Sequence, residues 1–345
     1  MDSSECKVSV IVPVHNSEKT ISYCLKKVIT ESKKLESEVI VVDDASTDNT
    51  LNILKEFKDI KIISLDYNTG AGNARNEGAN IAKYDNLCFV DSDIYISDNS
   101  IINLIKRLNK GDNIGSISGT QDTNNLNKNN WSSNFVCLKS CYGTDEINHE
   151  KILSTCCSEF CAISKELFLK AGKWKVLTNA GGEEFALGYK IKKLEKNNIK
   201  TKESRYSGYW CDLNTRFKRI IQRTQKYIPL FLKKKSFDSK GTFATFGQSL
   251  SSLITLIMIL NIFLVLIFKN HIYFYIFLTL YLLQLIIELK FLIFAKNKFG
   301  FKMLLFSLYG IQVINLAIII GFLFYIFKLP FILKKSYLKK IEIPD

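Results

Sequence analysis

Hydrophobic and polar positions divide the chain into two parts with different patterns. Up to about residue 240, short apolar runs alternate with mixed polar segments, whereas residues 243–328 are dominated by Leu, Ile, Phe and Tyr. In the first part, continuous apolar runs rich in β-branched residues predict buried strands, at residues 8–14, 38–43, 61–65 and 86–90. Helices are expected after these runs, over about 16–32, 47–57, 74–82 and 100–109. The alternation predicts an α/β fold with a Rossmann-like, mostly parallel sheet covered on both faces.

The remainder of the first part is less regular. Residues 111–150 are rich in Asn, Ser and Thr, and we expect loops there. A strand is expected over 160–163, with helices over 165–170 and about 181–196. We expect all three tryptophans to be core residues, at Trp131, Trp174 and Trp210.

The second part contains three apolar segments, at residues 243–268, 272–295 and 304–327. Each is long enough to cross about 30 Å of hydrocarbon, which takes about 20 helical residues. We therefore expect a soluble domain over residues 1–235 and an anchor of about three transmembrane helices over 236–345. Glu288 lies toward one end of its segment, where snorkelling to the interface is the simplest expectation.

Charge supports a membrane partner more than a nucleic acid. The formal net charge is +14, and much of it lies in residues 190–240 and 328–340, on either side of the apolar part. Basic residues beside membrane spans are attracted to anionic lipid headgroups, and no nucleic-acid-binding motif is present. With the soluble domain in the cytoplasm, three spans would place the lysine-rich tail outside, against the positive-inside rule. Either one span is re-entrant or the tail violates the rule.

Cysteine usage is typical of a reducing compartment. The chain has nine cysteines, and its polar N-terminus carries no export signal, so free thiols are expected. Cys137, Cys141, Cys157 and Cys161 form two pairs, but the spacing within each pair is wider than in most structural zinc sites. Buried free thiols are the preferred interpretation.

Polar residues follow the predicted strands at the points where these end. In parallel sheets, ligands bind beyond the carboxyl ends of the strands, so we expect these side chains to converge there: His15, Asp43, Asp44, Asp91 and Asp93. Two carboxylates one residue apart, as in Asp91-Ser-Asp93, can hold Mg²⁺ or Mn²⁺ together with a substrate diphosphate. Singly, each residue also has a simpler explanation, such as helix capping by Asp43 and Asp44.

Five stretches in order resemble the family 2 glycosyltransferases, which have the A-type nucleotide-sugar-binding fold. The stretches are residues 8–16, 41–48, 72–78, 89–93 and 182–188, within a match over about 6–230. The resemblance implies that Pro13 and His15 line the nucleotide pocket, that Asp44 binds the base with support from Asp43, and that Arg75 helps to hold the pocket.

The same resemblance implies roles for four carboxylates. Asp91 would contact the ribose or sugar, and Asp93, with Asp91, would ligate the metal. Glu184 occupies the position where the family usually has a catalytic Asp, and Glu183 is the possible substitute. A base there would take the proton of the acceptor hydroxyl.

An acceptor or diphosphate contact is expected from one aromatic and one basic-aromatic element. Trp174 lies where the family often has an aromatic residue. Residues 223–227 are similar to the Gln/Arg-x-x-Arg-Trp element of membrane-bound members, through Arg223, Lys226 and Tyr227. Lys lacks the bidentate fork of Arg, and a basic helix beside the membrane explains this segment equally well.

Together these features predict a metal-dependent, inverting glycosyltransferase in the membrane. It would use a nucleotide-sugar donor and a lipid-linked or cell-surface glycan acceptor. Two alternatives remain open: a processive polysaccharide synthase, and a non-catalytic membrane scaffold that binds nucleotides.

Overall fold

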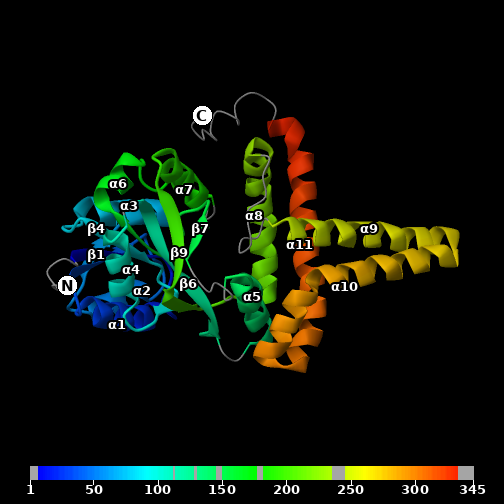
Figure 1. Cartoon of the computed structure of the whole chain (residues 1–345), viewed down its shortest axis with the longest axis horizontal. Helices are drawn as coiled ribbons and strands as arrows, with labels where there is room; N and C mark the ends of the chain where they lie inside the picture. The colour runs from blue at the N-terminus through cyan, green and yellow to red at the C-terminus, as the bar shows by residue number, and fades with distance from the viewer. Residues whose placement is uncertain are drawn as a thin grey trace. The chain divides into compact units, whose positions relative to one another are not determined.

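The computed structural model describes residues 7–111, 113–127, 130–144, 150–176, 182–234 and 245–332. Side chains within residues 226–234 and 329–332 are excluded from the description, apart from that of Ile228. The chain divides into two compact units. The first comprises Met1–Leu126 and Thr144–Tyr209, and the second comprises Asn127–Gly143 and Trp210–Asp345. Figure 1 shows the elements of both units, coloured along the chain.

The first unit begins with the predicted parallel strands. They lie in the order β3-β2-β1-β4, with bounds β1 (Lys7–Val14), β2 (Glu36–Asp43), β3 (Lys61–Ser64) and β4 (Asn86–Val90). The connecting helices are α1 (Ile21–Ser32), α2 (Thr50–Lys55) and α3 (Ala71–Ile81). Pairing between β1 and β4 stops at Ile11, two residues before Pro13, so the missing N–H of Pro13 removes no bond from that ladder.

Both faces of this sheet are buried, which explains why the strands are apolar without alternation. Val10 and Val12 of β1 pack in one apolar cluster with residues of α1 and α4 (Ser100–Asn109). Ile11 points into a second cluster with residues of α3, α6 (Lys165–Lys170) and α7 (Glu183–Lys193). The α/β class and the two covered faces are as predicted.

The sheet continues beyond β4 as a mixed sheet, in the order β4-β8-β6-β9-β5 with β7 also paired to β9. These strands are β5 (Ile94–Ile96), β6 (Ile114–Asn125), β7 (Lys151–Leu153), β8 (Phe160–Ser164) and β9 (Asn197–Gly208). β8 runs antiparallel to both β4 and β6, whereas β6 and β9 are parallel. The parallel half therefore carries the strand ends that were predicted to converge.

The prediction of loops over residues 111–150 is wrong, because this region contains β6 and α5 (Trp131–Cys141). β6 is polar because its hydroxyl groups bond to the neighbouring strand β9. Ser118 Oγ donates to the Ile199 carbonyl at 3.1 Å, and Thr120 Oγ1 donates to the Thr201 carbonyl at 2.8 Å. A strand whose buried side chains are satisfied in this way has no apolar signature to read from the sequence.

The second unit is helical. It contains α5, although this helix lies between β6 and β7 in the sequence, together with α8 (Leu213–Lys234), α9 (Phe246–Phe268), α10 (His271–Phe299) and α11 (Phe301–Ile332). Over Phe246–Phe268, His271–Phe299 and Phe301–Lys328, three helices are long and apolar enough to cross a membrane. They cover the second and third predicted apolar segments and residues 246–268 of the first, whose residues 243–244 lie outside the described residues.

Three smaller expectations have clear outcomes. The cysteines in the described part of the chain are free thiols, as expected. Trp131 is not a core residue, because 47% of its surface is exposed at the first position of α5. Glu288 does not snorkel: it is buried and pairs with Lys139 of α5, with 2.7 Å between Oε2 and Nζ.

Candidate nucleotide-sugar site

The ends of β1 and β2 are joined by hydrogen bonds beyond their last paired residues. The Asp44 N–H donates to the Val14 carbonyl at 2.8 Å, and His15 Nδ1 lies 2.8 Å from the Asp44 carbonyl oxygen. Asn16, which has a left-handed backbone (φ 50°), accepts from the Thr47 N–H at 2.8 Å. His15 is exposed at this edge, whereas Pro13 is buried within β1.

The Asp44 carboxylate fixes the turn that begins α3. Oδ1 accepts from the N–H and the hydroxyl of Thr69 at 2.7 and 2.9 Å, and Oδ2 accepts from the Gly70 N–H at 2.8 Å. A carboxylate offers about four acceptor positions, so these three bonds leave room for one more donor, such as a base N–H. Asp43, also buried, accepts from the Ser46 N–H at 3.3 Å.

Arg75, on α3, is the buried cation of this edge. It is 2% exposed, and its Nη2 donates to Asp91 Oδ1 at 2.5 Å. Its Nε and Nη1 have no hydrogen-bond partner among the described residues. A buried guanidinium with unused donors is costly unless a ligand satisfies them, so these two nitrogens are available to an anionic oxygen.

The Trp174 ring stacks against the guanidinium of Arg75. Its ring centroid lies 5.4 Å from Arg75 Cζ, within the range of a cation–π contact. Asn76 holds the Trp174 backbone on both sides, since its Oδ1 accepts from the Trp174 N–H at 3.0 Å and its Nδ2 donates to the Trp174 carbonyl at 2.9 Å. With 2% of its surface exposed, Trp174 is placed to position Arg75 and presents no open face to an acceptor.

The two aspartates after β4 differ in environment. Asp91 is half-buried beside Arg75, whereas Asp93 is exposed. Burial raises the pKa of Asp91 to about 7, with Arg75 opposing and the Asp93 carboxylate reinforcing the shift. Between them, Ser92 Oγ lies 2.9 Å from Ser17 Oγ, which ties this turn to the segment after β1.

The donor set of Asp91 and Asp93 suits a hard divalent cation. Within the described ranges, no group of three or more His, Cys, Asp or Glu is placed to hold a metal. Mg²⁺ and Mn²⁺ need no such cage, because they are commonly held by one or two carboxylates plus substrate phosphates and water. The pair therefore fits a cation that is bound together with a diphosphate.

The two candidate bases begin α7. Glu183 is 7% exposed, and its charge acts on Arg75. Glu184 is half-buried, where Oε2 accepts from the Gly182 N–H at 3.2 Å and Oε1 accepts from the Ser158 hydroxyl at 3.4 Å. Both carboxylates lie in the first turn of α7, where negative charge interacts favourably with the helix dipole.

The basic-aromatic segment lies in the other unit, on α8. Arg223 is half-buried there. The side chains of Lys226 and Tyr227 lie outside the described residues, so their expected contact with the acceptor or diphosphate stays a prediction.

The residues that position the candidate site side chains were not predicted from the sequence. Asn76 belongs to the 72–78 stretch, and its polar character on a buried helix face was the available signal. Gly188 allows α7 to approach residues 154–156, since a Cβ there would lie 2.6 Å from the Cys156 nitrogen. The Ser17–Ser92 contact has no sequence signal, because it joins residues far apart in the chain.

Part of the chain is similar to known proteins. Residues 9–171, just under half of the chain, match the model described as Glycosyl transferase family 2. A poly(ribitol-phosphate) beta-glucosyltransferase from Bacillus spizizenii is 39% identical over 102 residues, covering 28% of this chain and 16% of the relative. A UDP-Glc:alpha-D-GlcNAc-diphosphoundecaprenol beta-1,3-glucosyltransferase from Escherichia coli is 37% identical over 100 residues, covering 28% of this chain and 39% of the relative. Each match thus spans well under half of the relative.

A solved structure resembles almost the whole chain. It is a mannosyltransferase from Pyrobaculum calidifontis in complex with GDP-Man and Mn²⁺. The two chains superpose with a TM-score of 0.54 at 16% identity, covering 93% of this chain and 87% of the other. At this identity the similarity establishes the fold, which is the A-type glycosyltransferase fold followed by apolar helices.

Replacing Arg75 with Met tests the buried ion pair. Removing one partner of such a pair costs about 3–5 kcal/mol of folding free energy. Without the guanidinium the pKa of Asp91 rises above its value of about 7. The folded state then holds this proton to a higher pH than the unfolded chain does, so stability falls as the pH rises.

We therefore expect the loss in thermal-unfolding midpoint, relative to wild type, to be larger at about pH 8.5 than at about pH 6. Arg107→Met is the matched control, because Arg107 pairs with Glu150 at a partly exposed position, where an ion pair contributes about 0–1 kcal/mol. An equal loss at both pH values for Arg75→Met would contradict the assignment.

Proposed function

We propose that the chain is an inverting glycosyltransferase that moves a sugar from a nucleotide-sugar donor to a membrane-lipid-linked or cell-surface glycan acceptor. The observation that carries this proposal is the Arg75–Asp91 pair at the carboxyl end of β4, with two unused guanidinium donors. Donors of this kind suit diphosphate or sugar oxygens. The relatives from Bacillus spizizenii and Escherichia coli, by name, act on a polyol-phosphate polymer and on a lipid diphosphate.

Donor binding uses the ends of β1, β2 and β4. His15 and Asp44, supported by Asp43, would bind the nucleoside next to Pro13, and Arg75 and Asp91 would bind the ribose, sugar or diphosphate. Mg²⁺ or Mn²⁺ held by Asp93 and Asp91 would neutralise charge on the departing nucleoside diphosphate.

Proton transfer is assigned to the start of α7. As the acceptor oxygen attacks the anomeric carbon, the bond to the diphosphate breaks and the carboxylate of Glu184 or Glu183 takes the hydroxyl proton. Attack from the face opposite the leaving group inverts the anomeric configuration. Trp174 acts through Arg75 in this scheme, while Arg223, Lys226 and Tyr227 would contact the acceptor or the diphosphate.

The chain would work at a membrane surface with its catalytic domain in the cytoplasm. We place the functional boundary at residues 235 and 236, with a multi-pass anchor over 236–345. Lys296 and Lys298 end α10, and the positive-inside rule favours the cytoplasmic side for them. Holding the enzyme at the bilayer brings it close to a lipid-linked acceptor.

Asp93→Ala tests the metal-dependent reaction. We expect turnover of the donor sugar to fall by about 100-fold or more, because a cation supplies several kcal/mol of charge stabilisation. The measurement is release of nucleoside diphosphate in the presence of Mn²⁺. Asp59→Ala is the control, since Asp59 is an exposed surface residue just before β3, at the amino end of that strand. Transfer that survives Asp93→Ala would count against the proposal.

Glu183→Gln and Glu184→Gln separate the two candidate bases. Loss of a general base lowers kcat by about 10²- to 10⁴-fold, whereas loss of a neighbouring carboxylate has a smaller effect. We expect one variant to show this loss while donor binding, measured by thermal shift, is retained. Full activity in both variants would exclude the start of α7 as the source of the base.

A further inference from the structure

The exposed face of α8 is entirely polar over its described side chains. Its exposed residues are Asn214, Lys218, Arg219 and Gln222, whereas Leu213 and Ile220 are buried. Lysine or arginine at the centre of a bilayer costs about 2.5–3.5 kcal/mol each. An amphipathic helix with a basic outer face instead lies along a membrane surface, beside the headgroups. α8 therefore has the character of a surface helix.

α11 runs alongside α8 in the same direction. A Cβ at Gly321 would lie 2.8 Å from Thr224 Cβ and 2.9 Å from the Ile221 carbonyl oxygen, so the two backbones are very close. Seven residues later, Lys328 Nζ donates to Gln225 Oε1 at 3.1 Å. Figure 1 shows α8 and α11 side by side. The second half of α11 cannot cross hydrocarbon unless the basic face of α8 crosses with it.

α9 and α10 form a hairpin that leaves this pair. In Figure 1 they lie side by side and project away from α8 and α11. Lys269 and Asn270 form the tip, and large apolar side chains are exposed near it on both helices, including Leu260, Phe263 and Ile267 on α9. This projecting part has the surface of a membrane-inserted hairpin.

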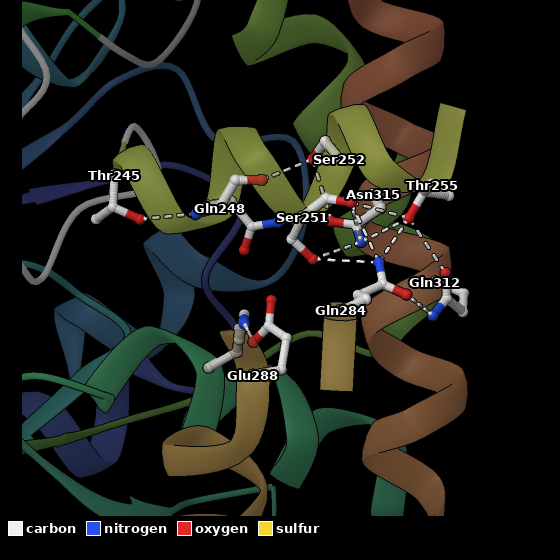
Figure 2. Close-up of polar contacts among 10 residues, drawn as sticks. Thr245, Gln248, Ser251, Ser252, Thr255, Gln284, Glu288, Gln312 and Asn315 are labelled. Carbon is white, nitrogen blue, oxygen red and sulfur yellow. Dashed lines mark hydrogen bonds and ion pairs between the residues drawn. The ribbon is translucent and has the colours of Figure 1, made fainter. Parts of the chain in front are cut away.

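A buried polar network joins the base of the hairpin to the middle of α11 (Figure 2). Gln284 of α10 donates to Thr255 Oγ1 of α9 at 2.7 Å and accepts from Gln312 Nε2 of α11 at 2.7 Å. Asn315 of α11 donates to Ser251 Oγ at 3.0 Å. Buried amides need such partners in apolar surroundings, so the network fixes where α11 crosses the hairpin.

The position of this network along the hairpin indicates its depth. At about 1.5 Å per residue, Thr255 and Ser251 lie about 21 and 27 Å from the tip at Lys269. If the tip reaches one side of a hydrocarbon layer of about 30 Å, the network lies close to the opposite side. Asn315, which is near the middle of α11, therefore lies near the membrane surface. In a spanning helix the same residue would lie near the bilayer centre.

We propose that only α9 and α10 cross the bilayer. α11 then lies with α8 along the membrane surface on the side where the base of the hairpin lies, opposite the tip. Lys328, at the end of the described side chains of α11, is then on the same side as α8. Anionic headgroups would contact the basic face formed by Lys218 and Arg219. The lysine-rich tail of the sequence then obeys the positive-inside rule. This arrangement does not depend on the catalytic activity.

Epitope tags in the full-length chain test this topology. One tag is inserted between Lys269 and Asn270, and in a separate protein one is added after Asp345. Antibody binding is measured on sealed right-side-out bacterial spheroplasts, before and after permeabilisation. We expect the first tag to be accessible in sealed spheroplasts and the second only after permeabilisation. A tail tag accessible before permeabilisation, or a hairpin tag inaccessible before it, would overturn the proposal.

A matched pair of charge substitutions gives a second, independent readout. Leu260 of α9 and Leu316 of α11 are both exposed, at 55% and 39%. Leu260 lies about 14 Å from the tip, near the bilayer centre. We expect Leu260→Lys to lose most carbonate-resistant membrane protein and Leu316→Lys to retain nearly all of it. Equal loss in both would show that α11 spans the bilayer, against the proposal.

Discussion

The catalytic unit depends on one constraint: the guanidinium of Arg75 is buried, so its positive charge needs a partner inside the protein. Asp91 supplies the opposite charge, with 2.5 Å between its Oδ1 and Arg75 Nη2. The Trp174 ring centroid lies 5.4 Å from Arg75 Cζ. Asn76 of α3 forms two hydrogen bonds with the Trp174 backbone. The same helix therefore carries Arg75 and also fixes the position of the Trp174 ring that contacts it. The end of β4 and the start of α3 are thereby locked together, and two unused donors remain at the edge where a diphosphate would bind.

The same physical rule organises the anchor unit. Polar groups in apolar surroundings must find partners, and Gln284, Gln312 and Asn315 find theirs in one another and in the hydroxyls of α9. The Lys139–Glu288 pair extends this pattern to α5, a helix contributed by the segment between β6 and β7. Elements that are distant in sequence are thus joined by satisfied polar contacts as well as by apolar packing.

Elements with a clear pattern of apolar residues could be predicted from the sequence. β1, β2 and β4 were correctly predicted because strands buried on both faces are continuously apolar, and the partly buried edge strand β3 was correctly predicted as well. β6 and α5 were missed because their buried polar residues resemble a loop. Arg75 was expected only to help hold the nucleotide pocket, and its ion pair with the half-buried Asp91 joins residues that no local sequence pattern relates. The hydropathy of α11 likewise does not reveal that it runs beside the polar helix α8.

We propose that the carboxyl ends of β1, β2 and β4 form a metal-assisted nucleotide-sugar site. The most direct test is a thermal-shift measurement on the detergent-purified chain with UDP, GDP, CDP and dTDP, each with and without Mn²⁺. A ligand that binds only the folded state raises the melting temperature by mass action. The account predicts that one nucleotide stabilises wild type only with Mn²⁺ and fails to stabilise Asp93→Ala. No shift with any nucleotide in wild type would contradict it.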